Sequence, residues 1–136
     1  MSTKLLYFSD AKQVSSELAK KCRNLSYREN GALASEFSAA RKGDFPAKVA
    51  ILLDVDTQTV FGWGAYLDYH TKAEIMVYVR VKCRRKGYGT KIVNRLISAS
   101  NRHNKRNKSR TVYQPEHDPC NDFYLKKVNN PCLECV

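Results

Sequence analysis

The sequence of 136 residues lacks the features of a membrane or secreted protein. No apolar run approaches the roughly 18 residues that a membrane-spanning helix needs. The opening residues, MSTKLLYFSD, do not follow the basic, apolar and small-residue order of a secretory signal. Internal repeats and low-complexity tracts are missing as well. We therefore expect one globular domain over residues 1–136 that is cytoplasmic, with its five cysteines as reduced thiols.

Acidic residues are absent from one long segment. Between Arg80 and Arg110 the chain has twelve of its 24 Lys and Arg residues and no Asp or Glu. The remaining residues carry all thirteen acids and twelve bases, so the net charge of +11 comes from this segment. A local excess of this kind predicts an anionic ligand on the face that the segment forms.

Hydrophobic periodicity predicts a mixed α/β fold with the order β-α-α-β-β-β-α-β-α. The expected strands are Lys4–Ser9, Ala47–Val55, Val60–Tyr69, Ala73–Val81 and Thr111–Pro115. The expected helices are one capped by Asp10 with Gln13 at its third position, a shorter one that follows Asn30 and ends near Gly43, one from Gly87, and a last short one over Asn121–Lys127. The basic run Asn101–Arg110 is expected to be a loop.

The stretch RRKGYGTKI, residues 84–92, joins a predicted strand to a predicted helix. Glycines at 87 and 89 let a backbone turn tightly and approach a ligand without a Cβ clash. The first amides of the following helix have no intrahelical acceptor, so a pyrophosphate fits there. A basic surface turn explains the bare pattern equally well.

The longer stretch VRVKCRRKGYGTKIVNRL, Val79–Leu96, resembles the acetyl-CoA motif of the GCN5-related N-acetyltransferase (GNAT) superfamily. Val79, Arg84, Gly87 and Gly89 occupy its defining positions, and the element order is similar along nearly the whole chain. The resemblance implies a GNAT-like acyl-CoA N-acyltransferase fold with acetyl-CoA as co-substrate. Family members usually add two strands after the last helix, so it also implies a shortened C-terminus or a homodimer that completes the sheet.

The resemblance assigns cofactor contacts to this stretch. The main chain of the fourth strand would pair with the pantetheine arm, and amides from Arg84 to Thr90 would hold the pyrophosphate. The implied cofactor-binding residues are Val79, Arg80, Val81, Arg84, Arg85, Lys86, Gly87, Tyr88, Gly89 and Thr90.

Two catalytic residues are implied. HDPCNDFYLKK resembles the family's last-helix pattern, which places Tyr124 as the general acid that protonates the leaving thiolate; a phenol with a pKa of about 10 holds its proton at neutral pH. A tyrosine packed on the sheet is the alternative. Glu74 stands where histone-type members carry a catalytic base, and the alternatives are an exposed strand residue and a chain of water molecules.

The same C-terminal segment departs from the family pattern. His117 replaces the usual Asn and Cys120 the usual Ala; His117 is expected to bond to pantetheine or a phosphate. His117, Cys120, Cys132 and Cys135 also have a spacing that zinc sites use. We expect no metal, because the resemblance puts Cys120 in the small-residue position of the last-helix pattern and His117 at the border of the cofactor cleft; the alternative is thiols that are buried or frayed near the C-terminus.

Together these features predict an N-acetyltransferase that transfers acetyl to a primary amine by direct attack in a ternary complex. The amine would belong to a protein lysine or N-terminus, a small molecule or an aminoacyl-tRNA, and no motif selects among them. The alternative is a non-catalytic GNAT-fold module whose basic segment, Arg80–Arg110, binds nucleic acid or an acidic protein. A third interpretation is that the segment is a solvated basic loop that also binds the 3′-phosphate of coenzyme A.

Overall fold

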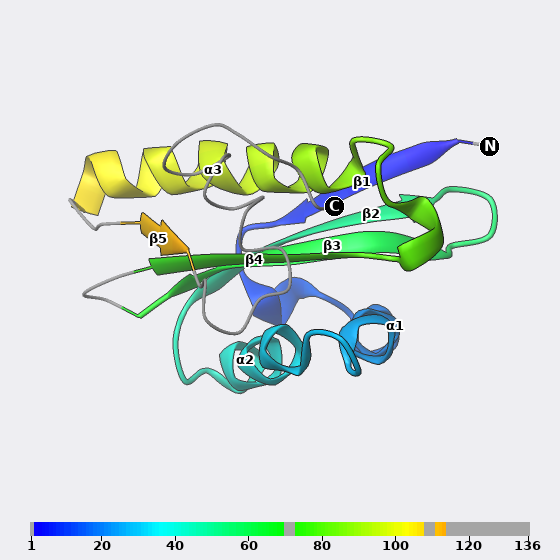
Figure 1. Ribbon diagram of the computed structural model, residues 1–136. Coiled ribbons are helices and arrows are strands. Elements are labelled where there is room, and N and C mark those ends of the chain that lie inside the picture. Colours follow the sequence, from blue (N-terminus) through cyan, green and yellow to red (C-terminus); the bar gives the residue numbers. More distant parts are fainter. Residues whose placement is uncertain (1, 70–72, 108–110, 114–136) are drawn as a thin grey trace.

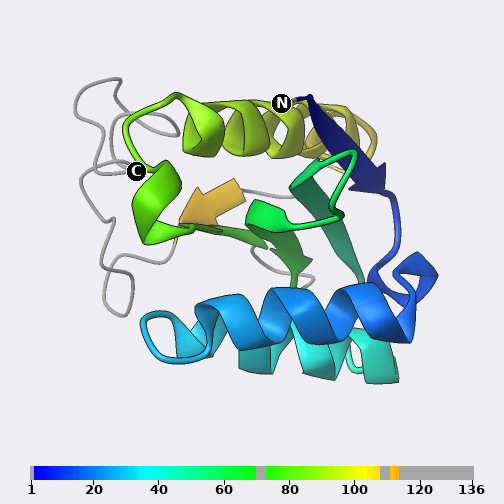
Figure 2. The ribbon, with the colours of Figure 1, turned by 90° about the vertical axis from the view of Figure 1, so that its right-hand side faces the viewer.

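The computed structural model describes residues 2–69, 73–107 and 111–113, with residues 100–107 and 111–113 described by their backbone. A five-stranded sheet lies between helix α3 on one face and helices α1 and α2 on the other (Figures 1 and 2). The strands follow one another across the sheet in chain order, as β1 (Thr3–Phe8), β2 (Ala47–Asp54), β3 (Val60–Asp68), β4 (Ala73–Val79) and β5 (Thr111–Tyr113).

The first four strands are antiparallel and the last pair is parallel. Leu5 lies opposite Leu52, Ile51 opposite Trp63, and Gly64 opposite Val77, whereas Ala73 to Ile75 run parallel to Thr111 to Tyr113. Helix α3 (Tyr88–Asn107) crosses between β4 and β5, and forms the predicted βαβ unit with them. The predicted fold class and the late βαβ unit are thus confirmed.

Alternation along β4 (Ala73–Val79) divides the core into two layers. Ile75, Val77 and Val79 lie in a cluster with Ile92 and Leu96 of α3. Met76 and Tyr78 point to the opposite face, where the cluster contains Trp63 and the residues of α1 (Ser16–Ser26) and α2 (Gly31–Lys42). Both layers are fully buried, so β4 is covered by helices on both faces, as its continuous apolar sequence requires.

Helix α3 approaches the sheet over two glycines of β3. A Cβ at Gly64 would lie 2.6 Å from the carbonyl oxygen of Met76 and 3.0 Å from Ile92 Cγ2. A Cβ at Gly62 would lie 2.9 Å from the Tyr78 carbonyl oxygen and 3.1 Å from Ile92 Cδ1. The missing side chains therefore let the first half of α3 pack directly on the backbone of β3 and β4.

The first helix begins later than predicted. The Asp10 side chain accepts a hydrogen bond from Lys12 N at 2.9 Å, but it caps only the 3₁₀ turn η1 (Ala11–Gln13). Val14 is then extended and buried, which interrupts the helix, and Ser15 caps α1 by accepting from Leu18 N at 3.2 Å. Because η1 is separate, α1 has 11 residues and α2 has 12, so the second helix is not the shorter one.

Two boundaries near the glycine stretch also differ from the prediction. Strand β4 ends at Val79, because Val81 begins a second 3₁₀ turn, η2 (Val81–Cys83), and its side chain is 58% exposed. Helix α3 continues to Asn107, so residues 101–107 are helical and not a loop. Once the packed first turns are formed, each added residue gains a hydrogen bond, and Arg and Lys are good helix formers. The predicted last helix, Asn121–Lys127, lies outside the described residues.

Candidate acetyl-CoA site

A strained turn connects β4 to α3. Residues 84–87, which we call the cradle turn, follow η2 directly. Two of its residues are left-handed: Arg85 with φ of 66° and Gly87 with φ of 83°. A side chain in this region costs of the order of 1–3 kcal/mol, so the surrounding contacts must hold Arg85 there.

The backbone amides of the cradle turn and of the residues before it differ in their hydrogen bonding. The N–H groups of Cys83 and Arg84 donate within the preceding turn, to the carbonyls of Arg80 at 2.7 Å and Val81 at 3.3 Å. Within residues 2–69, 73–107 and 111–113, the N–H groups of Arg85, Lys86 and Gly87 meet no acceptor. The carbonyl of Gly87 accepts from Lys91 N at 3.1 Å, so the positive end of α3 begins here. Amides without a protein acceptor at the start of a helix are the arrangement that a phosphate group can accept hydrogen bonds from.

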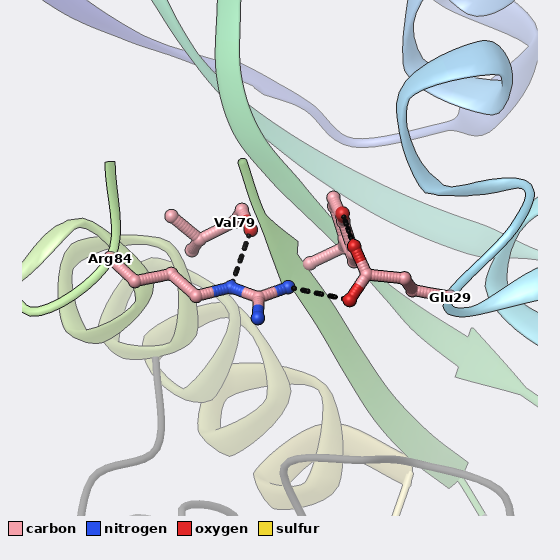
Figure 3. Close-up of polar contacts among 4 residues, drawn as sticks. Glu29, Val79 and Arg84 are labelled. Atoms are coloured by element: carbon pink, nitrogen blue, oxygen red, sulfur yellow. Dashed lines mark hydrogen bonds and ion pairs between the residues drawn. The ribbon is translucent and has the colours of Figure 1, made fainter. Parts of the chain in front are cut away.

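The basic side chains of the turn have different surroundings. Arg85 and Lys86 are exposed. Arg84 instead folds back along the strand, and its Nε donates to the Val79 carbonyl oxygen at 2.9 Å (Figure 3). Its Nη2 lies 3.5 Å from Oε2 of Glu29, in the connection between α1 and α2. We call this side chain with its two bonds the Arg84 strap.

Tyr78 completes the contact at Glu29. Its hydroxyl donates to Glu29 Oε1 at 2.5 Å, and its ring lies 5.3 Å below the guanidinium carbon of Arg84. Burial and the bond to Glu29 raise the pKa of Tyr78, and Arg84 opposes this shift only in part. The phenol therefore stays protonated at neutral pH and remains a donor to the carboxylate.

Tyr88 and Thr90, two further residues of the implied cofactor site, begin α3. The Tyr88 ring stacks on Phe61 of β3 with centroids 5.8 Å apart, which fixes the start of the helix against the sheet. Tyr88 can thus contribute its main chain to a ligand while its side chain packs.

Glu74 lies near the opposite end of β4. It is only 6% exposed, so the alternative of an ordinary exposed strand residue is wrong. Tyr69, which donates to Glu36 Oε2 at 2.7 Å, is close enough for Glu74 to affect it: burial raises the pKa of Tyr69, and Glu36 and Glu74 add to the increase. At about 3.3 Å per residue, Glu74 stands roughly 16 Å along the strand from Val79.

A polar groove adjoins the end of β4. It has a volume of about 580 Å³ and is lined by α1, by the β2–β3 turn and by Arg80. The Arg80 guanidinium donates twice to the Val60 carbonyl oxygen, at 3.1 and 3.0 Å, and Lys21 Nζ donates to the Gln58 carbonyl oxygen at 3.3 Å. The groove residues include these two cations and no acid.

The remaining candidates, Tyr124, His117, Cys120, Cys132 and Cys135, lie outside the described residues. Among the residues that are described, no three His, Cys, Asp or Glu are grouped to hold a metal ion. No helix in the same part of the chain is long and apolar enough to span a membrane.

Three residues around the site were not predicted: Glu29, Tyr78 and Tyr69. Glu29 lies in the sequence YREN, which carries no motif. Tyr78 stands in β4 and Tyr69 directly follows β3, in segments predicted as strands, where an aromatic residue is expected for packing alone. Only the pairing of distant elements brings Glu29 to Arg84, 55 positions away.

Comparisons with known proteins agree with this geometry. The antiparallel strands, the parallel β4–β5 pair and the three helices form the acyl-CoA N-acyltransferase fold. Residues 17–128 match the profile described as the acetyltransferase (GNAT) family. The chain therefore belongs to the GNAT acetyltransferase family, whose members are acyltransferases that use acetyl-CoA.

Solved structures show the same fold at low identity. A candidate acetyltransferase from Exiguobacterium sp. 255-15 is 19% identical with a TM-score of 0.60, over 88% of this chain and 80% of its own. A Trypanosoma brucei acetyltransferase is 14% identical with a TM-score of 0.60, over 99% of this chain and 97% of its own. AAC(6′)-Iy, bound to the bisubstrate analogue CoA-S-monomethyl-acetylneamine, is 12% identical with a TM-score of 0.52, over 85% and 82%. No curated protein sequence matches significantly.

Proposed function

We propose that this protein transfers the acetyl group of acetyl-CoA to a primary amine by direct attack in a ternary complex. The observation that carries the proposal is the cradle turn, where the amides of Arg85, Lys86 and Gly87 stand together at the start of a 20-residue helix. Membership of the GNAT family and the coenzyme A analogue bound to a protein of similar fold support acetyl-CoA as the ligand.

The phosphate end and the reacting end of the ligand would lie at opposite ends of β4. The cradle turn holds the pyrophosphate, and the main chain at Val79 meets the start of the pantetheine arm. The arm then runs back along the strand toward Glu74, roughly 16 Å away. In this direction the thioester would come toward the buried carboxylate of Glu74.

The reaction needs two proton transfers. The amine nitrogen attacks the thioester carbonyl carbon, the carbon–sulfur bond breaks, and an amide forms. Glu74, directly or through water, takes the proton that the amine loses, and Tyr124 gives a proton to the departing thiolate. Holding the two reactants side by side supplies much of the acceleration, because the bimolecular step becomes effectively unimolecular.

The class of amine is left open by the described residues, and the candidates remain protein amines, small amines and aminoacyl-tRNA. One observation favours the alternative of a non-catalytic anion-binding module. The groove at Arg80 and Lys21 has no acid in its lining and lies outside the cradle turn. Salt-dependent binding of an oligonucleotide, with no acetyl transfer to any amine tested, would support this alternative.

The first test is the melting temperature with and without acetyl-CoA. At about a hundredfold excess over the dissociation constant, binding adds about 2.7 kcal/mol to the free energy of unfolding. For a domain of this size we expect an increase of roughly 5–15 °C. Differential scanning calorimetry measures it directly.

A substitution in the first turn of α3 tests whether acetyl-CoA binds at the cradle turn. Gly89→Glu adds a carboxylate in the first turn of α3, where it repels a pyrophosphate, and the increase with acetyl-CoA is expected to vanish. An unchanged melting temperature of the unsubstituted protein at saturating acetyl-CoA would contradict the proposal. An increase that survives Gly89→Glu would put the ligand elsewhere.

A further inference from the structure

We propose that Glu29 and Tyr78 are positioning residues for acetyl-CoA, which act through the Arg84 strap on the cradle turn. The inference rests on the proposed function. Neither residue belongs to the glycine motif. Both bind the one basic residue of the cradle turn whose side chain is directed away from solvent and back onto the strand (Figure 3).

The strap connects the end of β4 to the start of the cradle turn, and binding requires that these two points keep their relative position. Arg84 begins the cradle turn, and Val79 is the last residue of β4, so the bond from Arg84 Nε to the Val79 carbonyl closes a loop around η2. Directly after Arg84 comes the left-handed Arg85, whose strained backbone needs fixed neighbours. A fixed Arg84 therefore limits the conformations that the amides of Arg85 to Gly87 can adopt.

Glu29 and Tyr78 determine where the guanidinium lies. The carboxylate of Glu29 is held by the Tyr78 hydroxyl at 2.5 Å and lies 3.5 Å from Arg84 Nη2, while the Tyr78 ring supports the guanidinium from below at 5.3 Å. When the amides are already arranged before the ligand binds, the turn loses less conformational entropy on binding. Through Glu29 the cradle turn is also coupled to the connection between α1 and α2.

The negative charge of Glu29 weakens acetyl-CoA binding, whereas its positioning of Arg84 strengthens binding. The two effects can be measured separately. The carboxylate of Glu29 repels the phosphates of the ligand, but the side chain is 45% exposed, so salt screens this repulsion. Tyr78→Phe removes the hydroxyl without changing any charge. Tyr27→Phe is the matched control, because Tyr27 lies two residues before Glu29 in the same connection, but its side chain is 71% exposed.

The experiment measures the dissociation constant of acetyl-CoA by calorimetry at about 0.1 M and about 0.5 M salt, and the amide hydrogen exchange of residues 84–90 in the ligand-free protein. We expect Tyr78→Phe to bind acetyl-CoA roughly three- to tenfold more weakly at both salt concentrations, which is about 0.7–1.4 kcal/mol. Exchange in residues 84–90 should be faster, and Tyr27→Phe should change neither quantity. Glu29→Gln should bind more weakly than the unsubstituted protein at the higher salt.

A double-mutant cycle shows whether Arg84 is the link. Arg84→Gln keeps an N–H donor but loses the charge that faces Glu29, so adding Tyr78→Phe to it should cause little further loss. Additive losses, or a Tyr78→Phe protein with unchanged affinity and unchanged exchange, would overturn the inference. If the unsubstituted protein does not bind acetyl-CoA, the proposed function fails, and the exchange of the ligand-free turn still tests the strap.

Discussion

At the scale of single residues, the described site contains groups whose surroundings keep them protonated. Tyr78 and Tyr69 each donate to a glutamate and each has a raised pKa, with burial as the largest cause. Cys22, on the buried face of α1, is the third such group. Burial raises the pKa of its thiol from 9.0 to about 12, although the neighbouring Arg23 opposes the shift.

Because the thiol of Cys22 is buried, we expect the free energy of unfolding to fall in alkali. Above pH 9 the unfolded chain releases this proton, whereas the folded protein retains it up to about pH 12, so rising pH favours unfolding in this window. From pH 8 to pH 10 this thiol should lower the free energy of unfolding by roughly 1 kcal/mol. Cys22→Ala should lose less stability than the unsubstituted protein over this interval in urea titrations, and equal losses would contradict the buried thiol.

At the scale of elements, the site depends on how closely α3 lies on the sheet. Its start is fixed by Tyr88 on Phe61, and its next turn by Ile92 over the two glycines of β3. The cradle turn is short and is held between β4 and α3. Any change in the height of α3 above the sheet therefore moves the amides that would bind phosphate.

Gly64→Ala tests this close packing. The added Cβ would lie 2.6 Å from a backbone oxygen of Met76, which cannot rotate away, so we expect a loss of about 1–3 kcal/mol in the free energy of unfolding. Gly62→Ala, at 2.9 Å, should lose less. Gly31→Ala is the control, because no atom of the described residues lies within 4 Å of a Cβ there. Urea unfolding measures all three, and equal effects would show that the clash does not limit packing.

At the scale of the whole molecule, half of the basic residues lie in one acid-free segment that includes the cradle turn and α3. The structure changes the interpretation of this segment, because residues predicted to form a loop continue the helix to Asn107. Part of the charge is thereby placed along a helix that begins at the proposed phosphate site. A protein with a net charge of +11 attracts anionic ligands from solution, and salt screens this attraction.

The charge predicts that salt weakens acetyl-CoA binding selectively. Between about 0.05 M and about 0.5 M salt we expect the dissociation constant to rise roughly tenfold. Acetyl-pantetheine, which lacks the phosphates of the nucleotide, should bind weakly with little dependence on salt. Calorimetry compares the two ligands. If both respond equally to salt, the basic segment does not face the phosphates.

Much of the fold could be predicted from the sequence because it depends on local periodicity. Alternation identified the strands, a 3.6-residue stripe identified α3, and the two glycines predicted the turn between β4 and α3. The errors occurred at boundaries. The buried Val14 separates η1 from α1, and η2 ends β4 before Val81; both depend on contacts with elements elsewhere in the chain.

The sequence by itself determined the class of fold, the family motif and the excess of positive charge, because each is a property of neighbouring residues. Tertiary structure decided which side chains support the motif. The bond from Arg84 to Glu29 depends on how the connection between α1 and α2 lies against the sheet, and the burial of Glu74 is a property of the folded protein. Such contacts join residues far apart in the chain, and no local pattern encodes them, since they form only when the sheet and helices are assembled.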